Sequence, residues 1–234
     1  MRTPAPLPTA NNLLAALPRK DQREMLEGMD QVELTYGEIL YEPGEPIRHV
    51  YFPNNALVSL LTMVDAHQAL EVGLVGRDGM VGLPLALEIA VSPIRALVQG
   101  TGTALRMAAA PFLRNLRLRK SLQREIHLYT ASLMAQITQT AACNRFHVVE
   151  ARLARWLLMT HDRVLVNPFH QTQEILAHML GVRRVGVTRA ASALQSKKLI
   201  AYSRGIITIL DRKGLEGAAC SCYEIVRGMR TSSP

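Results

Sequence analysis

The feature that most constrains the fold is a helical pattern, a glycine and a second helical pattern, which follow one another in the C-terminal part of the chain. Thr172 and the acidic Glu174 predict the start of the first helix, because both residue types stabilise exposed amides at a helix N-terminus. Gly181 predicts the tight left-handed turn between two helices that cross steeply. The sequence therefore predicts a helix-turn-helix, whose first helix buries Ile175, Leu176, Met179 and Leu180.

The second helix of this motif is basic at its N-terminal end. Its inward side is apolar, with Val187, Ala190, Ala191 and Leu194 at helical spacing. In helix-turn-helix proteins the N-terminal end of this helix enters the major groove of DNA. We therefore expect double-stranded DNA as a partner, contacted by Thr172, Arg183, Arg184, Thr188, Arg189, Lys197 and Arg204.

Two β-rich runs within residues 199–210 surround Ser203, Arg204 and Gly205, a pattern typical of a hairpin. A hairpin directly after the helix-turn-helix predicts the wing of a winged helix. The formal net charge of +8 is weak evidence by itself, but no acidic residue lies between Arg183 and Arg204. This placement favours a phosphate-facing surface over the alternative, a solvated basic face.

The N-terminal half has a different, β-rich pattern. Residues up to Pro8 are typical of a tail, Asn12 is expected to cap a short helix, and Pro18 is expected to open another. Short strands separated by turn residues then predict a sandwich or rolled barrel. The expected strands are residues 32–40, 49–52, 56–63, 71–75 and 96–107.

After Pro111 the pattern predicts one long helix of about thirty residues. Its apolar stripe is expected to face a second copy of the chain, which predicts a homodimer; the alternative is packing against the C-terminal part. The pattern breaks at residues 144–147, and a further helix is expected over 148–161. The dimerisation stripe is Leu122, Ile126, Tyr129 and Leu133.

These boundaries divide the chain into four parts. Residues 1–31 form a tail with flanking helices, and residues 32–110 form the β-rich domain. Residues 111–147 are the dimerisation helix and hinge, and residues 148–234 are the winged helix-turn-helix.

Several motifs together resemble the Crp/Fnr family of transcription regulators. They are Gly37-Glu-Ile-Leu-Tyr-Glu-Pro-Gly44-Glu, Val50-Tyr-Phe, Gly79-Met-Val-Gly82, Phe146 at the hinge, and Leu-Gly181-Val-Arg-Arg184. The resemblance implies an α+β fold with a cyclic-nucleotide-binding-like β-roll that senses an effector, a long dimerisation helix and a C-terminal winged helix. It also implies sequence-specific regulation of transcription from an inverted-repeat operator, together with RNA polymerase.

The same resemblance gives roles to individual residues of the second helix. By position, Arg184 matches the arginine with which the family reads guanine, and Arg189 matches a second family arginine. Val185 and Gly186 replace an acidic residue and a Thr of the family pattern. We therefore expect an operator that differs from the usual family half-site.

The effector is expected to differ from cyclic AMP. The cyclic AMP-binding members carry a Gly-Glu-Leu cassette, whereas this chain has Leu83 and Pro84 after Gly82. The remaining candidates for binding an unknown small-molecule effector are Gly82, Arg95 and Thr138. No cysteine precedes Cys143, which argues against the N-terminal iron-sulfur cluster of the fumarate-nitrate regulators, so no cofactor is expected.

The three cysteines are expected to have no catalytic or metal-binding role. Cys143 and His147 lie four residues apart at the hinge, where packing is the favoured interpretation, and Cys220-Ser-Cys222 is interpreted as structural. Because the sequence shows no Gly-rich phosphate loop and no metal-ligand cluster, we expect that the protein is not an enzyme. The alternatives are an effector-independent architectural DNA-binding protein and a nucleotide-gated regulatory subunit.

No apolar run is long enough to cross a membrane, since residues 56–64 form the longest and include Thr62. The N-terminus lacks the pattern of a signal peptide. We therefore expect a cytoplasmic protein with no membrane partner. The effector, the operator, and the choice between activation and repression are left open by the sequence.

Overall fold

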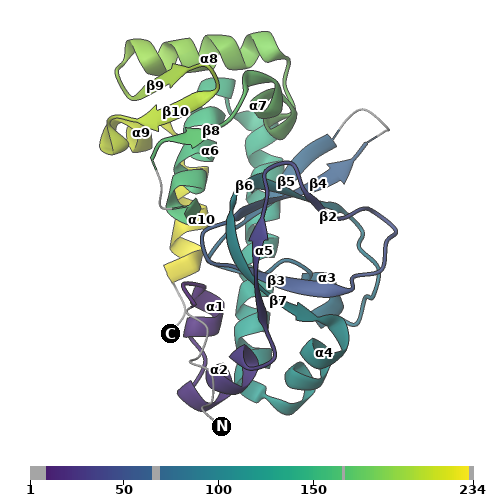
Figure 1. The fold of residues 1–234 in the computed structure, drawn as a ribbon. Coiled ribbons are helices and arrows are strands. Elements are labelled where there is room, and N and C mark those ends of the chain that lie inside the picture. The colour runs from purple at the N-terminus through teal and green to yellow at the C-terminus, as the bar shows by residue number, and fades with distance from the viewer. Residues whose placement is uncertain (1–8, 65–68, 165–166, 232–234) are drawn as a thin grey trace. The chain divides into compact units, whose positions relative to one another are not determined.

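The computed structural model in Figure 1 describes residues 9–64, 69–164 and 167–231. The expected tail up to Pro8 lies outside the described residues. The chain divides into two compact units, one made of residues 1–58 and 75–131 and the other of residues 59–74 and 132–234. Each unit is described by itself.

The first unit begins with two short helices, α1 (Asn12–Ala15) and α2 (Arg19–Leu26). The predicted cap of the first helix is wrong by one residue, because the Asn11 side chain accepts a hydrogen bond from the Leu14 amide at 3.2 Å. The side-chain amide of Asn11 also donates to the carbonyl oxygens of Pro53 and Gly79, at 2.9 and 2.8 Å. Asn11 is fully buried, so this position serves two turns of the β-rich region as well as the helix.

The strands of the β-rich region are short, as predicted, and lie in two sheets. One sheet has the order β1-β7-β3, with β1 (Asp30–Leu34), β7 (Gly102–Ala108) and β3 (His49–Pro53), and pairs Val32 with Ala104. The other has the order β2-β6-β4-β5, with β2 (Ile39–Tyr41), β6 (Arg95–Gly100), β4 (Leu57–Met63) and β5 (Ala69–Val75).

Two of the predicted strands are each divided into two. Residues 32–40 contain a turn at Gly37, whose φ of +84° is the left-handed region that favours glycine. Residues 96–107 are interrupted at Thr101, so that β6 and β7 lie in different sheets. Glycines mark both breaks, Gly37 in the first and Gly100 and Gly102 in the second, and the sequence interpretation did not treat them as turns.

The single helix predicted after Pro111 is also divided, into α4 (Ala109–Leu118) and α5 (Lys120–Phe146). Arg119 between them has extended φ and ψ of −118° and 107°. The Phe112 side chain of α4 is fully buried, and its ring centroid lies 6.4 Å from that of Phe52 on β3. Because α4 packs against the strands, the chain turns before α5, and Arg119 Nη2 donates to Glu24 Oε2 at 2.6 Å. A four-residue helix, α3 (Leu83–Ala86), also belongs to this unit.

The second unit is organised around α6 (Val149–Val164), which packs against α8 (Arg184–Ser196), α9 (Arg212–Ala218) and α10 (Cys222–Thr231). Helix α6 extends a few residues beyond the predicted end at His161. Trp156 of α6 is 3% exposed, and its Nε1 donates to Glu71 Oε1 of β5 at 2.8 Å. In Figure 1, α8 lies at the outer end of this unit with a β-hairpin beside it. None of the helices in the described part of the chain is both long enough and apolar enough to span a membrane.

Candidate nucleic-acid interface

Helix α7 (Gln173–Leu180) begins and ends where the sequence predicted. Thr172 is its N-cap, and the hydroxyl oxygen accepts a hydrogen bond from the Ile175 amide at 3.3 Å. The helix ends at Gly181, whose φ of +59° and ψ of 43° place it in the left-handed region. The turn therefore depends on a residue that tolerates positive φ. The buried side chains of α7 are Leu176, Ala177, Met179 and Leu180.

Helix α8 follows with the predicted division between a buried and an exposed side. Val187, Ala190, Ala191 and Leu194 are buried at three- and four-residue spacing. Arg183 is the N-cap residue, and Arg183, Arg184, Thr188 and Arg189 are all exposed. The first turn of α8 has no acidic side chain, so the positive end of the helix dipole adds to the charge of these arginines.

The two helices are joined by a polar contact that the sequence interpretation missed. Thr188 Oγ1 donates to Gln173 Oε1 at 2.7 Å and to the Arg184 carbonyl oxygen at 3.1 Å. Gln173 is the first residue of α7, where its side chain reaches the exposed side of α8. Its adjacency to the Thr172 cap was the only available signal for it.

The predicted wing is present as a three-stranded sheet. Its order is β8-β10-β9, with β8 (Phe169–His170), β10 (Ile206–Ile209) and β9 (Ile200–Ser203). Ile206 pairs with Ser203, which leaves Arg204 and Gly205 as a two-residue turn with φ of +51° and +80°. Positive φ at both positions is typical of a type I′ hairpin turn. Strand β8, which pairs with β10, was not predicted.

The wing and the two helices surround a hollow on the surface. Its volume is about 330 Å³. Tyr202 of β9 donates its hydroxyl to the Gln171 carbonyl oxygen at 2.8 Å, which fixes the wing to the segment before α7. Burial raises the pKa of Tyr202, and the nearby charge of Arg184 acts in the opposite direction. The residues that line the hollow are Thr172, Gln173, Arg184, Gln195, Tyr202, Arg204 and Gly205.

The basic side chains of this surface differ in their ion pairs. Lys197 Nζ lies 2.6 Å from Glu150 Oε1 of α6, so its charge is already paired. Four exposed arginines on the same surface, by contrast, have no ion pair with any residue that the structure describes. They are Arg183, Arg184, Arg189 and Arg204. Cations of this kind on a convex helix and its wing form a surface suited to phosphates and base edges.

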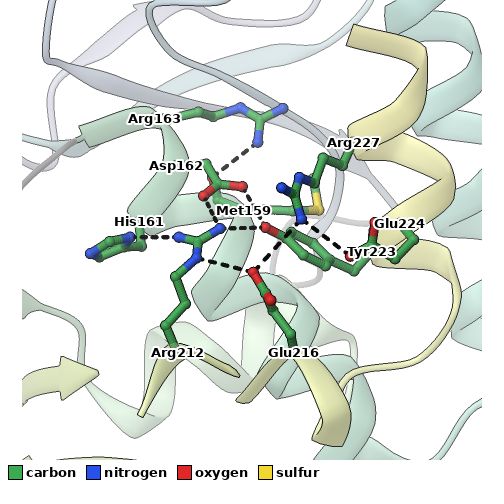
Figure 2. A network of polar contacts seen from close by, with 9 residues as sticks. All are labelled: Met159, His161, Asp162, Arg163, Arg212, Glu216, Tyr223, Glu224 and Arg227. Carbon is green, nitrogen blue, oxygen red and sulfur yellow. Dashed lines mark hydrogen bonds and ion pairs between the residues drawn. The ribbon is translucent and has the colours of Figure 1, made fainter. Parts of the chain in front are cut away.

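A polar network connects α6, α9 and α10 (Figure 2). Arg212 of α9 lies 2.7 Å from Asp162 Oδ1 and 3.0 Å from Glu216 Oε1. Its Nη2 also donates to the Tyr223 hydroxyl at 2.7 Å, and that hydroxyl donates to Asp162 Oδ2 at 2.8 Å. Burial, followed by the contact with Asp162, raises the pKa of Tyr223. Burial and Arg212 lower the pKa of His161, which lies 3.0 Å from Arg212 Nη1, while Asp162 opposes them.

Two of the three expected effector residues have partners within the first unit, and the third lies on α5. Arg95 Nε lies 2.8 Å from Glu42 Oε2, so the cation expected to bind an anion is already paired. Gly82 has a φ of +98°, and a Cβ there would lie 3.0 Å from the Tyr41 hydroxyl. Thr138 is exposed, and its hydroxyl donates to the Met134 carbonyl oxygen at 2.9 Å.

The expected dimerisation stripe is largely buried within a single chain. Leu122, Ile126 and Leu133 are 0%, 2% and 7% exposed. Tyr129 donates its hydroxyl to the Met80 carbonyl oxygen at 3.0 Å. By contrast, Met134 on α5 is 63% exposed. The apolar surface that α5 offers to another molecule is therefore centred on different residues from those of the predicted stripe.

The comparisons with known proteins agree with this geometry. Residues 151–218 match the family model of the Crp-like helix-turn-helix domain. No curated protein matches the sequence.

Solved structures of Crp/Fnr-type regulators share the fold. FixK2 from Bradyrhizobium japonicum has a TM-score of 0.70 at 15% identity, covering 82% of this chain and 98% of its own. A CRP/FNR family regulator from Thermus thermophilus has a TM-score of 0.67 at 22% identity, covering 81% and 98%. The c-di-GMP-responsive regulator CLP from Xanthomonas campestris has a TM-score of 0.65 at 16% identity, covering 82% and 99%. The predicted resemblance is thus confirmed in the helix-turn-helix domain and in the fold.

Proposed function

We propose that this chain is a transcription regulator of the Crp/Fnr type, which binds a specific DNA sequence through α8 and the β9–β10 wing. The observation that supports this best is the group of exposed arginines at the N-terminal end of α8 and at the wing turn, within a domain that matches the Crp-like helix-turn-helix. Helix α8 would enter the major groove, and the wing would follow the adjacent phosphates.

Within this proposal, Arg184 reads a base and the other arginines bind phosphates. Arg184 lies in the first turn of α8 and lines the hollow beside the wing. A guanidinium can donate two parallel hydrogen bonds to guanine O6 and N7. Thr188 and Gln173 would fix the backbone from which the Arg184 side chain extends, since the Thr188 hydroxyl contacts both the Arg184 carbonyl oxygen and Gln173 Oε1. Thr172 and Lys197 contribute less, because one caps α7 and the other pairs with Glu150.

Competition binding of an Arg184→Ala variant tests this assignment. An operator would first be selected from a random duplex pool with the unsubstituted protein. Loss of one bidentate arginine should then cost about 1–3 kcal/mol of discrimination between operator and scrambled duplex, with nonspecific binding retained. Lys213→Ala, which removes an exposed charge from α9, is the matched control. An unchanged ratio for Arg184→Ala would remove this residue from base recognition, and failure to select any operator would contradict the function itself.

We further propose that the chain binds an inverted repeat as a homodimer, with the exposed side of α5 in the interface. This side carries Ala131, Met134, Thr138 and Ala141, at alternating spacings of three and four residues. Such spacing suits helix pairing in a coiled coil, and the two α8 helices would then contact half-sites about 34 Å apart. Met134→Lys should weaken both the dimer and operator binding.

Light scattering of Met134→Lys beside the unsubstituted protein measures this effect. Leu118→Lys is the control, because Leu118 is also apolar and 73% exposed but lies at the end of α4. A wild-type monomer at micromolar concentration, or equal weakening by both variants, would contradict the proposed interface.

The β-rich region of residues 32–110 is proposed to modulate DNA binding through a small-molecule effector, with residues 111–147 as the connecting helix and residues 148–234 as the DNA-binding domain. A regulator of this type would act with RNA polymerase in the cytoplasm, where the DNA is. The alternative is an architectural DNA-binding protein without effector. Screening metabolites for any change in operator affinity separates the two, because the alternative predicts none.

A further inference from the structure

Four potential metal ligands from two distant parts of the sequence meet in the second unit. Cys143 lies in the last turn of α5, and His147 directly follows that helix. Cys220 lies between α9 and α10, and Cys222 is the first residue of α10. The three sulfur atoms and one imidazole nitrogen all lie within 4.8 Å of one another. In the sequence, Cys143 with His147 and Cys220 with Cys222 form two separate pairs, and neither pair alone predicts a metal site. The fold brings the two pairs together.

We propose that Cys143, His147, Cys220 and Cys222 bind one zinc ion in a closed, tetrahedral, structural site. The Sγ atoms of Cys143 and Cys220 are 3.4 Å apart, and Cys222 Sγ is 3.4 Å from His147 Nδ1. With Zn–S near 2.3 Å and Zn–N near 2.0 Å, neighbouring ligand atoms of a tetrahedral site lie about 3.5–3.8 Å apart. These two separations are already within a few tenths of an ångström of that range, and the other ligand pairs, all within 4.8 Å, would close by up to about 1 Å around such an ion.

The same distances argue against two other uses of the cysteines. A disulfide would bring two sulfur atoms to about 2.05 Å, and all three cysteines are free thiols. An iron-sulfur cluster places several inorganic atoms between its protein ligands, so its cysteine sulfurs must lie farther apart than in this compact group. A single metal ion that prefers tetrahedral coordination fits the distances between these ligand atoms best.

The charges around the cluster also suit a metal-thiolate centre. A zinc ion with three thiolates and a neutral imidazole has a net charge of −1. Arg152 and Arg155 of α6 are each 6% exposed, and their charges act on both Cys143 and Cys220. Arg155 Nε and Nη1 and Arg152 Nε are buried without a hydrogen-bond partner among the described residues. Neither arginine has an ion pair among the described residues, and because a buried cation without an anionic partner is costly, an anionic centre beside these guanidinium groups would compensate their charge.

The immediate surroundings support and close the site. Gln139 Nε2 donates to Cys222 Sγ at 3.0 Å, a contact that orients a thiolate ligand. The three cysteines form a buried cluster with Ala151 packed against it, and His147 is only partly exposed. Four protein ligands leave no open position for water or substrate, as in structural zinc sites. The ion would thereby fix the start of α10 to the end of α5, while the adjacent Tyr223 fixes α10 to α6.

Metal analysis of the full chain tests the proposal directly. Protein purified under reducing conditions, without chelator and with zinc in the growth medium, should contain one zinc per chain. After removal of zinc, added Co²⁺ should give the visible absorption of tetrahedral cobalt and the charge-transfer bands of cobalt-thiolate bonds. Cys143→Ser and Cys222→Ser should lose the metal, and Gln139→Leu should weaken binding by about 10–100-fold. Ser221→Ala is the matched control, because Ser221 is exposed between two of the ligands.

Measurements on the unsubstituted protein keep the proposal falsifiable if a variant fails to fold. A strong chelator should lower its thermal midpoint, and zinc should restore it. Folded wild-type protein that holds no zinc and gives no tetrahedral cobalt spectrum would overturn the proposal. A Cys143–Cys220 disulfide in freshly prepared, metal-free protein would overturn it in favour of a redox pair, and metal retained by both cysteine variants would show that the ion lies elsewhere.

Discussion

The buried carboxyl of Glu71 is predicted to make the second unit less stable as the pH rises towards neutrality. Glu71 is 7% exposed, and its two oxygens accept hydrogen bonds from Trp156 Nε1, at 2.8 Å, and from Ser59 Oγ. Burial raises the pKa of Glu71 from 4.5 to about 7, although these hydrogen bonds and the charges of Arg155 and Arg163 lower it. Burial is the largest of these effects, so the folded state favours the neutral acid.

The sign and size of the effect follow from this pKa. Between pH 4.5 and about 7 the folded state binds more protons at Glu71 than the unfolded state. Its contribution to stability is therefore fully present below pH 4.5 and is lost as the pH rises through 7. The difference of 2.5 pKa units, 7 minus 4.5, corresponds to roughly 3 kcal/mol. Glu71→Gln stays neutral, can still accept from Trp156, and can donate to Ser59, so it should remove this pH dependence.

Urea denaturation at several pH values between about 5 and 8 measures the difference. Trp156 is the only tryptophan of the chain and touches Glu71, so its fluorescence follows unfolding of this unit. Glu33→Gln, which removes an exposed carboxylate on β1, should leave the pH dependence unchanged. Parallel stability profiles for the wild type and Glu71→Gln would refute the reasoning.

Three further predictions concern the DNA-binding domain and the β-rich region. Tyr223→Phe removes the hydroxyl shared by Asp162 and Arg212, so the free energy of unfolding should fall by about 1–3 kcal/mol; a change below measurement error would mean that the network of Figure 2 contributes nothing. Arg204→Ala at the wing turn should reduce the salt dependence of DNA binding by about one phosphate contact, equally for all sequences, and a sequence-dependent loss would contradict a phosphate role. Cyclic AMP should show no micromolar binding by calorimetry, because the resemblance aligns the buried Leu83 with the Glu of the Gly-Glu-Leu cassette, and a leucine offers no partner to a polar ligand group; tight binding coupled to stronger operator affinity would overturn this.

The helix-turn-helix and its wing were predictable because their signals are local. Gly181 and Gly205 mark backbone positions with positive φ, and the apolar spacing from Val187 to Leu194 defines the buried side of α8. These features lie within a few residues of one another, so pattern and structure coincide. The division between α4 and α5 was not predictable in the same way, because it depends on Phe112 packing against a strand far away in the sequence.

The sequence pattern also did not predict contacts between side chains that lie far apart in the sequence. From the sequence, Lys197 was expected to bind a phosphate, whereas in the structure it forms an ion pair with Glu150 of α6. The dimerisation stripe had the correct helical period, but the period alone does not say whether Ile126 faces its own domain or a second copy. Both outcomes depend on which surfaces the tertiary structure brings together.

One buried side chain relates the proposed metal site to the DNA-binding motif. Arg152 Nη2 donates to Asn144 Oδ1 at 2.8 Å, and Asn144 follows the ligand Cys143 in the last turn of α5. The same nitrogen donates to the Leu180 carbonyl oxygen, the last residue of α7 before the Gly181 turn. A carbonyl at a helix C-terminus lacks a partner within its own helix, so Arg152 supplies one where α7 turns into α8. We therefore expect a displacement of the α5 end at Cys143 to disturb the turn before α8, because both hydrogen bonds share the same guanidinium nitrogen.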